Sequence, residues 1–214
     1  MQKNFLVSVI IPVHNSFRFI GRCLRSLKNQ TLNKKYYEII IIDDFSTDLS
    51  LNEIKKHKSN NIKLIKNNSN LGLPASLNKG IKEAKGTLIT RVDSDDWVHE
   101  DFLNILSTFL CINKNLDAVS CDYALTDVNE KELKIENCLK KPIGCGIMFR
   151  TQQLFELGLY DLKFKYAEEE ALRKIFLMKY SITRIPLNLY RYRQHKNNRS
   201  KNKKLVKFYN KKIK

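Results

Sequence analysis

No stretch of the sequence is apolar over the length that a membrane-spanning helix needs. Residues 1–4 lead directly into a strand pattern and lack the chemistry of a cleavable signal peptide. The five cysteines are odd in number and lack metal-ligand spacing, which favours reduced thiols over a disulfide framework. We therefore expect a cytoplasmic protein, and its 214 residues, 43% of them hydrophobic, suffice for one core of ordinary size.

Acidic residues are absent from the last part of the chain. Every Asp and Glu lies at or before Glu170, and 15 of the 39 Lys and Arg follow it, so most of the net charge of +17 lies there. Residues 196–214 alternate Lys and Asn with few apolar side chains, and we expect them to fray and not to fold alone. We predict a catalytic domain over residues 1–195 and a basic tail over residues 196–214.

A basic tail can bind several kinds of anionic partner. Anionic lipids attract Lys and Arg, so we predict peripheral attachment of residues 196–214 to the inner face of the cell membrane. Nucleic acid, an acidic partner or mere solvation are the alternatives. A nucleic-acid module would need aromatic residues interleaved with the basic ones, and the tail has few.

The first part of the chain alternates between strand and helix patterns. Near-continuous apolar runs at 7–13, 37–42, 62–65 and 87–92 suit strands that are buried on both faces. Helical spacing of apolar residues predicts helices over 17–28, 48–57, 73–85 and 100–112. This order predicts an α/β fold with a mostly parallel central sheet flanked by helices.

The regularity weakens after residues 117–121. Residues 124–141 are either an antiparallel excursion or a surface loop. A strand over 143–150, a helix over 151–157, a helix that opens with Glu168 and short strands over 181–192 complete the expected elements.

Carboxylates gather where two of the predicted strands end. The strand at 87–92 runs into Asp93, Asp95 and Asp96, and the strand at 37–42 runs into Asp43 and Asp44. Like charges this close repel, and Mg²⁺ and Mn²⁺ take carboxylate oxygens as ligands. Because ligands of open α/β sheets bind at the carboxyl ends of the strands, the pattern favours a metal–diphosphate site. The alternatives are solvated turns, with Asp96 as a helix N-cap.

Taken together, these pieces resemble the family 2 glycosyltransferases, which have the GT-A nucleotide-diphospho-sugar transferase fold. The resemblance runs in the family's order along nearly the whole chain, and any one piece alone is weak. It rests on residues 9–15, 41–48, 70–72, 78–81, 84–86, 93–96, 146–150, an acidic pair at a helix start and residues 192–195.

The resemblance implies a site for a nucleotide-diphospho-sugar, most simply a UDP-sugar. Asp93 and Asp95 would form the Asp-x-Asp element, with one carboxylate on the ribose or sugar side and the other ligating a Mn²⁺ or Mg²⁺ that bridges the two phosphates. Ser94, between them, would contact the nucleotide-sugar. Asp96 is an alternative ligand, and the sequence does not rank the three. Arg193 and His195 would close over the diphosphate, although a His in a basic tail is often only solvated. The residues implied at the nucleotide are Pro12, Val13, Asn15, Asp43, Asp44, Asn70 and Gly72.

The family's inverting members use a carboxylate as general base at the start of a late helix. Aligning Leu172 with the leucine that usually follows places Glu169 in that position, with Glu170 as the close alternative. The family commonly has Glu-Asp there, whereas this chain has Glu-Glu. Acids also enrich the first turn of any helix, because the helix dipole favours them there.

The sequence thus predicts a metal-dependent, inverting hexosyl- or N-acetylhexosaminyl-transferase. Its acceptor would be a hydroxyl of a glycan or lipid-linked glycan in cell-surface polysaccharide synthesis. A sugar-nucleotide nucleotidyltransferase is the alternative within the fold. That class has a Gly-rich basic loop after the first strand, which residues 12–15 do not resemble.

Overall fold

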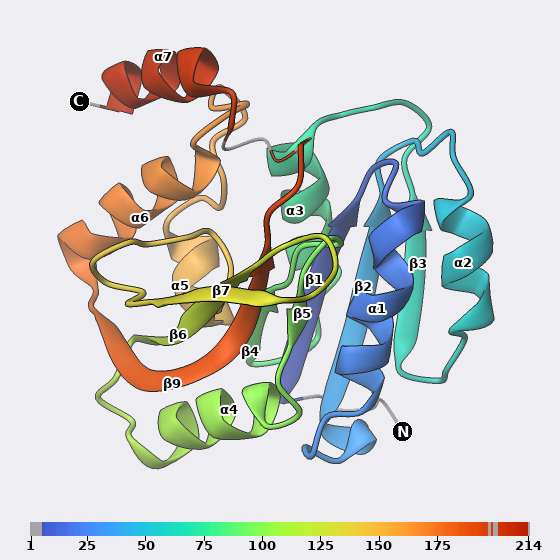
Figure 1. Ribbon diagram of the computed structural model, residues 1–214. Helices are drawn as coiled ribbons and strands as arrows, with labels where there is room; N and C mark the ends of the chain where they lie inside the picture. The colour runs from blue at the N-terminus through green and yellow to red at the C-terminus, as the bar shows by residue number, and fades with distance from the viewer. Residues whose placement is uncertain (1–5, 197, 199–200, 214) are drawn as a thin grey trace.

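Four parallel strands, connected through helices, make up the first half of the sheet. The structure, a computed structural model, describes residues 6–196, 198 and 201–213 (Figure 1). The strands run side by side in the order β3-β2-β1-β4, and every neighbouring pair is parallel. This half confirms the predicted β-α alternation. Its elements are β1 (Val7–Val13), α1 (Phe17–Lys28), η1 (Lys34–Tyr36), β2 (Tyr37–Asp43), α2 (Ser50–Lys56), β3 (Ile62–Lys66), α3 (Leu73–Lys82) and β4 (Leu88–Arg91).

Helices cover both faces of this half, and for that reason its central strands are apolar at every position. In β1, Val9 and Ile11 pack in the core beneath α1, α2 and α4, whereas Ile10 packs in the core beneath α3, α5 and α6. Side chains of a strand alternate between the two faces, so a continuous apolar run is what a doubly covered strand requires. All seven residues of β1, and all seven of β2, are buried.

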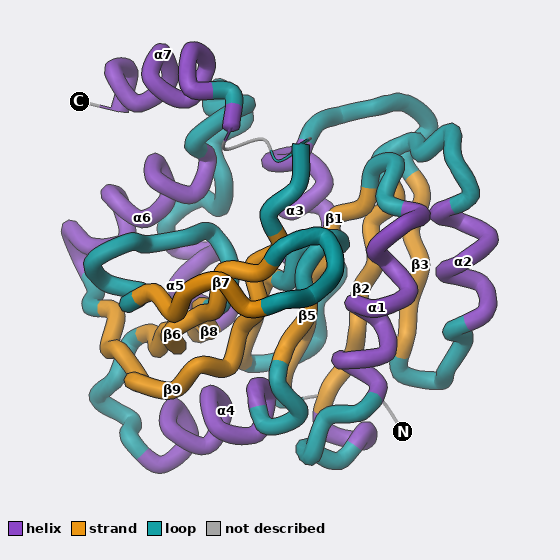
Figure 2. Tube along the Cα trace, in the orientation of Figure 1, coloured by secondary structure: helices purple, strands orange, loops and turns teal. Residues whose placement is uncertain are grey.

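The second half of the sheet is mixed. It continues the order as β8-β6-β9-β5, with β7 paired to β6 (Figure 2). The strand pairs β4–β8, β6–β8, β6–β7 and β5–β9 are antiparallel, and β6–β9 is parallel. Its elements are β5 (Trp97–Val98), α4 (Phe102–Ile112), β6 (Ala118–Thr126), β7 (Glu132–Glu136), β8 (Ile147–Arg150), α5 (Thr151–Glu156), α6 (Glu168–Lys179) and β9 (Ile182–Arg193).

This half departs from the sequence-based expectations in two places, and it decides between two alternatives in a third. The short strands expected over 181–192 are one long strand, β9, which bends through register shifts at Asp122 of its partner β6. Of the two alternatives for residues 124–141, the antiparallel excursion is the one found: strand β7 pairs antiparallel with β6. The strand expected over 143–150 begins only at Ile147, because the left-handed backbone of Gly146 (φ 71°) interrupts it.

The C-terminal segment was expected to fray, and this expectation is wrong for residues 203–213. They form helix α7 (Lys203–Ile213), which lies beyond α6 at the top of the view in Figure 1. Tyr209 of α7 stacks on Tyr166, with the ring centroids 6.1 Å apart. This aromatic contact supplies an apolar anchor that the Lys- and Asn-rich pattern did not reveal. Within the described residues, no helix is both long and apolar enough to cross a membrane.

Candidate active site

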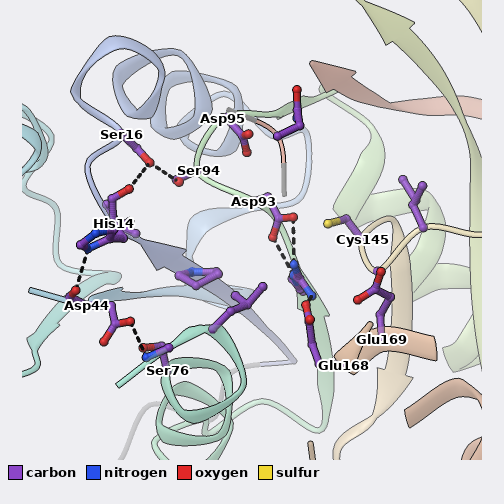
Figure 3. Close-up of a pocket in the computed structure, with 18 of the residues that line it drawn as sticks. His14, Ser16, Asp44, Ser76, Asp93, Ser94, Asp95, Cys145, Glu168 and Glu169 are labelled. Atoms are coloured by element: carbon purple, nitrogen blue, oxygen red, sulfur yellow. Dashed lines mark hydrogen bonds and ion pairs between the residues drawn. The ribbon is translucent and has the colours of Figure 1, made fainter. Parts of the chain in front are cut away.

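A cavity of about 630 Å³ opens at the carboxyl ends of the parallel strands (Figure 3). Its walls come from segments that lie far apart in the sequence. They are residues 12–16 at the end of β1, Phe19 of α1, Asp44 after β2, 70–76 at the start of α3, 91–95 at the end of β4, 142–145 before β8, 166–170 at the start of α6 and three positions after residue 191. The topology therefore brings both carboxylate clusters and the late acidic run to one place.

Most of the predicted site residues line this cavity, and three do not. Asp43, Asp96 and Arg193 are buried outside its lining. The predicted residues that line it are Pro12, Val13, Asn15, Asp44, Asn70, Gly72, Asp93, Ser94, Asp95, Glu169, Glu170 and His195.

Asp44 holds the loop 67–72 at one end of the cavity. Its Oδ1 accepts hydrogen bonds from the amide of Leu71 and the side chain of Asn67, and its Oδ2 accepts one from the amide of Gly72, each at 2.8 Å. Gly72 has φ 88°, a conformation that suits glycine. Asp43, by contrast, is buried with its Oδ1 lacking a partner among the described residues.

The segment after β1 is fixed by its own polar side chains. The Nδ1 of His14 lies 2.9 Å from the carbonyl oxygen of Asp44. Asn15 has a left-handed backbone (φ 51°), and its Oδ1 accepts from the amides of Thr47 at 2.8 Å and Asp48 at 3.3 Å. Asn15 therefore orders the loop after β2, in addition to facing the cavity.

The three carboxylates after β4 have three different surroundings. Asp93 accepts a bidentate ion pair from Arg91, at 2.6 and 3.0 Å. Asp96 is buried and accepts from the Tyr190 hydroxyl at 2.7 Å and the Arg193 amide at 2.8 Å. Burial, together with the neighbouring Asp95 and Asp93, raises the pKa of Asp96 well above its ordinary value. Asp95 lines the cavity, and its Oδ2 lies 2.7 Å from Nε2 of His195.

These surroundings bear on how a divalent cation would fit. Donor atoms of Asp93, Asp96 and Cys145 lie within 4.8 Å of one another. The thiol is a poor ligand for a hard cation, and burial raises the pKa of Cys145 well above its ordinary value. Both oxygens of Asp96 already accept hydrogen bonds. Of the three aspartates after β4, Asp93 and Asp95 line the cavity, and their carboxylate oxygens are donors of the kind that Mg²⁺ and Mn²⁺ take.

Helix α6 begins with three acids that face different ways. Ala167, directly before it, has a left-handed backbone (φ 59°). Glu168 is buried, and its Oε1 accepts from Nη1 of Arg91 at 3.2 Å. Glu169 lies on the wall that carries Cys145 (Figure 3), and Glu170 is exposed at the cavity edge.

Gly144 lies directly against this helix start. A Cβ added at Gly144 would meet Nη1 of Arg91 at 3.0 Å and the Cβ of Glu169 at 3.0 Å. The absence of a side chain thus allows the loop before β8 to pack on Glu169 and Arg91 at once.

Arg193 is buried outside the cavity lining and is held by partners from several segments. Its guanidinium lies 4.4 Å from the ring centroid of Trp97 and 5.0 Å from that of Phe19. It donates to the carbonyl of Asp95 at 2.9 Å and to Glu130 at 3.1 Å. This arrangement does not provide the diphosphate contact that the sequence predicted for Arg193, and the side chain instead supports the Asp95 loop.

Sequence reasoning missed Arg91 and Glu168 as site residues. Arg91 is the one charged residue in the strand-forming run 87–92, and it is buried. A charge in a buried strand needs a partner, and that signal could have identified it. Glu168 was the acid that the alignment on Leu172 left without a role.

The sequence is similar to known glycosyltransferases. The family model described as "Glycosyl transferase family 2" matches residues 8–176. The poly(ribitol-phosphate) beta-glucosyltransferase of Bacillus spizizenii is 46% identical over 100 residues, which are 45% of this chain and 16% of that protein. Glycosyltransferase GlyG of Streptococcus pneumoniae is 26% identical over 216 residues, which cover 88% of this chain and 71% of the relative.

Two solved structures have similar folds. Residues 1–349 of TarS from Staphylococcus aureus, in complex with UDP-GlcNAc, superpose with a TM-score of 0.80 at 23% identity, over 92% of this chain and 61% of that chain. The mannosyltransferase PcManGT from Pyrobaculum calidifontis, in complex with GDP-Man and Mn²⁺, superposes with a TM-score of 0.73 at 20% identity, over 90% of this chain and 58% of that chain. The chain therefore spans about three fifths of these structures, and far less of the Bacillus spizizenii relative.

Proposed function

Because the chain belongs to glycosyl transferase family 2, we propose that it transfers a hexosyl or N-acetylhexosaminyl group from a UDP-sugar to an acceptor hydroxyl, with inversion. The GT-A fold predicted from the sequence is confirmed. The observation that best supports the proposal is the cavity, because Asp93, Asp95 and Glu169 all line it. A donor diphosphate and an acceptor hydroxyl need these two kinds of group on either side of the anomeric carbon.

The relatives support the donor and the acceptor class. One is named as a poly(ribitol-phosphate) beta-glucosyltransferase and another, TarS, as a poly(ribitol-phosphate) beta-N-acetylglucosaminyltransferase. TarS has been solved with UDP and with UDP-GlcNAc. We propose a UDP-sugar donor and a glycan or polyol-phosphate acceptor of the cell surface.

In this mechanism the residues hold the two substrates and move one proton. Asp44 and Asn70 line the end of the cavity that receives the nucleotide base. A divalent cation on Asp95 and Asp93, when bound, supplies positive charge that stabilises the departing diphosphate. Glu169 accepts the proton of the acceptor hydroxyl as its oxygen attacks the anomeric carbon from the opposite side.

Within the acidic trio, Asp95 is the favoured metal ligand. Asp93 is paired bidentately with Arg91, and Asp96 is hydrogen-bonded through both oxygens. Asp95 has one oxygen beside His195 and lines the cavity. We therefore rank Asp95 before Asp93 and propose a structural role for Asp96.

Nucleotide-induced thermal stabilisation tests this proposal. UDP with Mn²⁺ should raise the melting temperature of the protein more than GDP or CDP with Mn²⁺, and more than UDP without metal, because bound ligands stabilise the native state. Asp95→Asn should abolish the dependence on Mn²⁺. Asp161→Asn, which removes a carboxylate at an exposed loop position, should keep it.

Two results would contradict the proposal. If a folded Asp95→Asn variant shows the full rise in melting temperature with UDP and Mn²⁺, Asp95 is not a metal ligand. If none of the three nucleotides raises the melting temperature of the wild type, the cavity is not a site for a nucleotide-diphosphate donor.

A further inference from the structure

Helix α7 and its lysines form a basic surface beside the cavity. Lys204, Lys207, Lys211 and Lys212 are exposed on this helix, and Phe208 among them is 51% exposed. The sequence has no acid after Glu170, so no carboxylate of α7 neutralises these charges. These five side chains are called the α7 surface below.

The helix is fixed to the body of the molecule and does not trail from it. Tyr209 stacks on Tyr166 with an interplanar angle of 24°, and its ring centroid lies 6.5 Å from that of Phe164. Lys174 of α6 donates from Nζ to the carbonyl oxygen of Ile213, at the other end of α7. A polar tail that merely attracts anions would need none of these contacts.

The attachment of α7 involves a residue of the cavity wall. Tyr166, against which Tyr209 stacks, is itself a residue of the cavity wall. Figure 1 shows α7 at the same edge of the molecule as the start of α6, which carries Glu169. The helix therefore packs directly against one residue of the cavity wall.

The side-chain chemistry of the α7 surface suits the interface of a lipid bilayer. Phe208 offers an exposed apolar ring, and Nζ of Lys212 lies 4.4 Å from its centroid. Lysines can lay their aliphatic stems along apolar surface while the ammonium groups contact anionic headgroups. A short helix with a basic face and an aromatic side chain lies in the interface and does not cross it.

We propose that the α7 surface docks this protein on an anionic lipid bilayer, with α7 lying in the headgroup region beside the cavity. Phe208 enters the boundary between headgroups and acyl chains, and the four lysines contact lipid phosphates. A lipid-linked acceptor would then reach Glu169 from the membrane side. The attachment to the membrane is then made by the folded helix α7 and not by an unfolded tail.

Vesicle binding by the full-length chain tests this. Wild-type protein should bind vesicles of phosphatidylglycerol and phosphatidylcholine, ignore pure phosphatidylcholine, and be released by salt. Replacing Lys204, Lys207, Lys211 and Lys212 by Gln should weaken binding by about 10²-fold or more, since each basic residue near the surface contributes. The matched control replaces four exposed lysines at the other end of the molecule, Lys34, Lys35, Lys55 and Lys58, by Gln and should bind nearly as well as wild type.

A fluorescent variant reports the depth of docking. The chain has one tryptophan, Trp97, which is buried, so Phe208→Trp adds a reporter on the α7 surface. Its emission should shift to the blue on anionic vesicles and stay unchanged with soluble inorganic polyphosphate.

Three outcomes would overturn the proposal. Equal loss of binding in the two lysine variants would show that net charge alone matters. A blue shift absent at saturating vesicles would show contact without docking of Phe208. Polyphosphate binding that needs the same four lysines, without vesicle binding, would assign the surface to a soluble polyanion. The thermal effect of UDP should be the same in all these variants, so failure here and failure of the donor site can be told apart.

Discussion

At the scale of single residues, Glu169 and Glu170 share one helical turn but differ in surroundings. Glu169 is half-buried against Gly144, whereas Glu170 is exposed at the cavity edge. A general base must lie within hydrogen-bond reach of the proton that it accepts. The half-buried position, next to the loop 142–145, is the better placed of the two.

This difference predicts unequal effects of two matched substitutions. Glu169→Gln keeps size and polarity but cannot accept a proton, so sugar transfer should fall by about 10²-fold or more while UDP binding persists. Glu170→Gln should change transfer only several-fold. Initial rates of transfer and the thermal effect of UDP measure the two quantities. The reverse pattern would place the base one residue later.

The three aspartates after β4 show what the sequence could and could not predict at this scale. Their place at a strand end was sufficient to predict that Asp93 and Asp95 line a cavity, whereas Asp96 is buried outside the lining. Their partners were not predictable, because Tyr190 and Arg193 lie 94 and 97 residues further along the chain from Asp96. Tyr190 and Arg193 reach Asp96 only because both lie on β9, which folds alongside this segment.

At the scale of elements, the pair β6–β9 holds the second half of the sheet together. Asp122 of β6 accepts from Nε of Arg184 in β9 at 2.9 Å and from the amide of Cys138 at 3.1 Å. The Arg184 guanidinium lowers the pKa of Asp122 below its ordinary value. Asp122 also sits where the register of β6 against β9 shifts, so its bonds compensate for a local break in the ladder.

The lowered pKa of Asp122 gives stability a defined dependence on pH. A depressed native-state pKa contributes stability above the unfolded-state pKa of about 4, and that contribution is lost as pH falls through the native-state value. Asp122→Asn should therefore reduce the free energy of unfolding by about 1–3 kcal/mol at pH 7. The difference from wild type should narrow below pH of about 4. Urea unfolding at several pH values measures it, and a difference that is constant with pH would exclude the ion pair as its cause.

The two halves of the sheet differed in how far their elements could be predicted. Strands β1 and β2 are buried on both faces, and their apolar runs identified them. Strand β9 carries Arg184, Asn188 and Arg191 among its apolar residues, because one of its faces is only partly covered. Strand β5 has two residues, too few for any periodicity.

At the scale of the whole molecule, Arg91 joins the two halves of the site. It extends from the end of β4 to Asp93 and to Glu168 at the start of α6, and only 10% of its side chain is exposed. It connects the segment that carries Asp93 and Asp95 with the helix that carries Glu169. The GT-A architecture could be predicted from motif order, but this connection could not, because it spans 77 residues of sequence.

Removing Arg91 should therefore destabilise the whole molecule. Arg91→Met leaves Asp93 and the buried Glu168 without their counter-charge and should cost about 3–5 kcal/mol of unfolding free energy. Adding Glu168→Met should recover part of that loss, since one of the two carboxylates that have lost the Arg91 guanidinium is then gone. Denaturant unfolding of the two single variants and the double variant gives the coupling. Additive effects would show that the Arg91–Glu168 contact is not energetically coupled.

Gly144 limits how the sequence of this loop can change. Any side chain at position 144 would displace Glu169 or Arg91 by a few tenths of an ångström, and both residues line the cavity. Pro142 and Ile143 line the same cavity and already carry side chains. Variation in this loop, natural or engineered, is therefore expected at positions 142 and 143, while position 144 stays glycine.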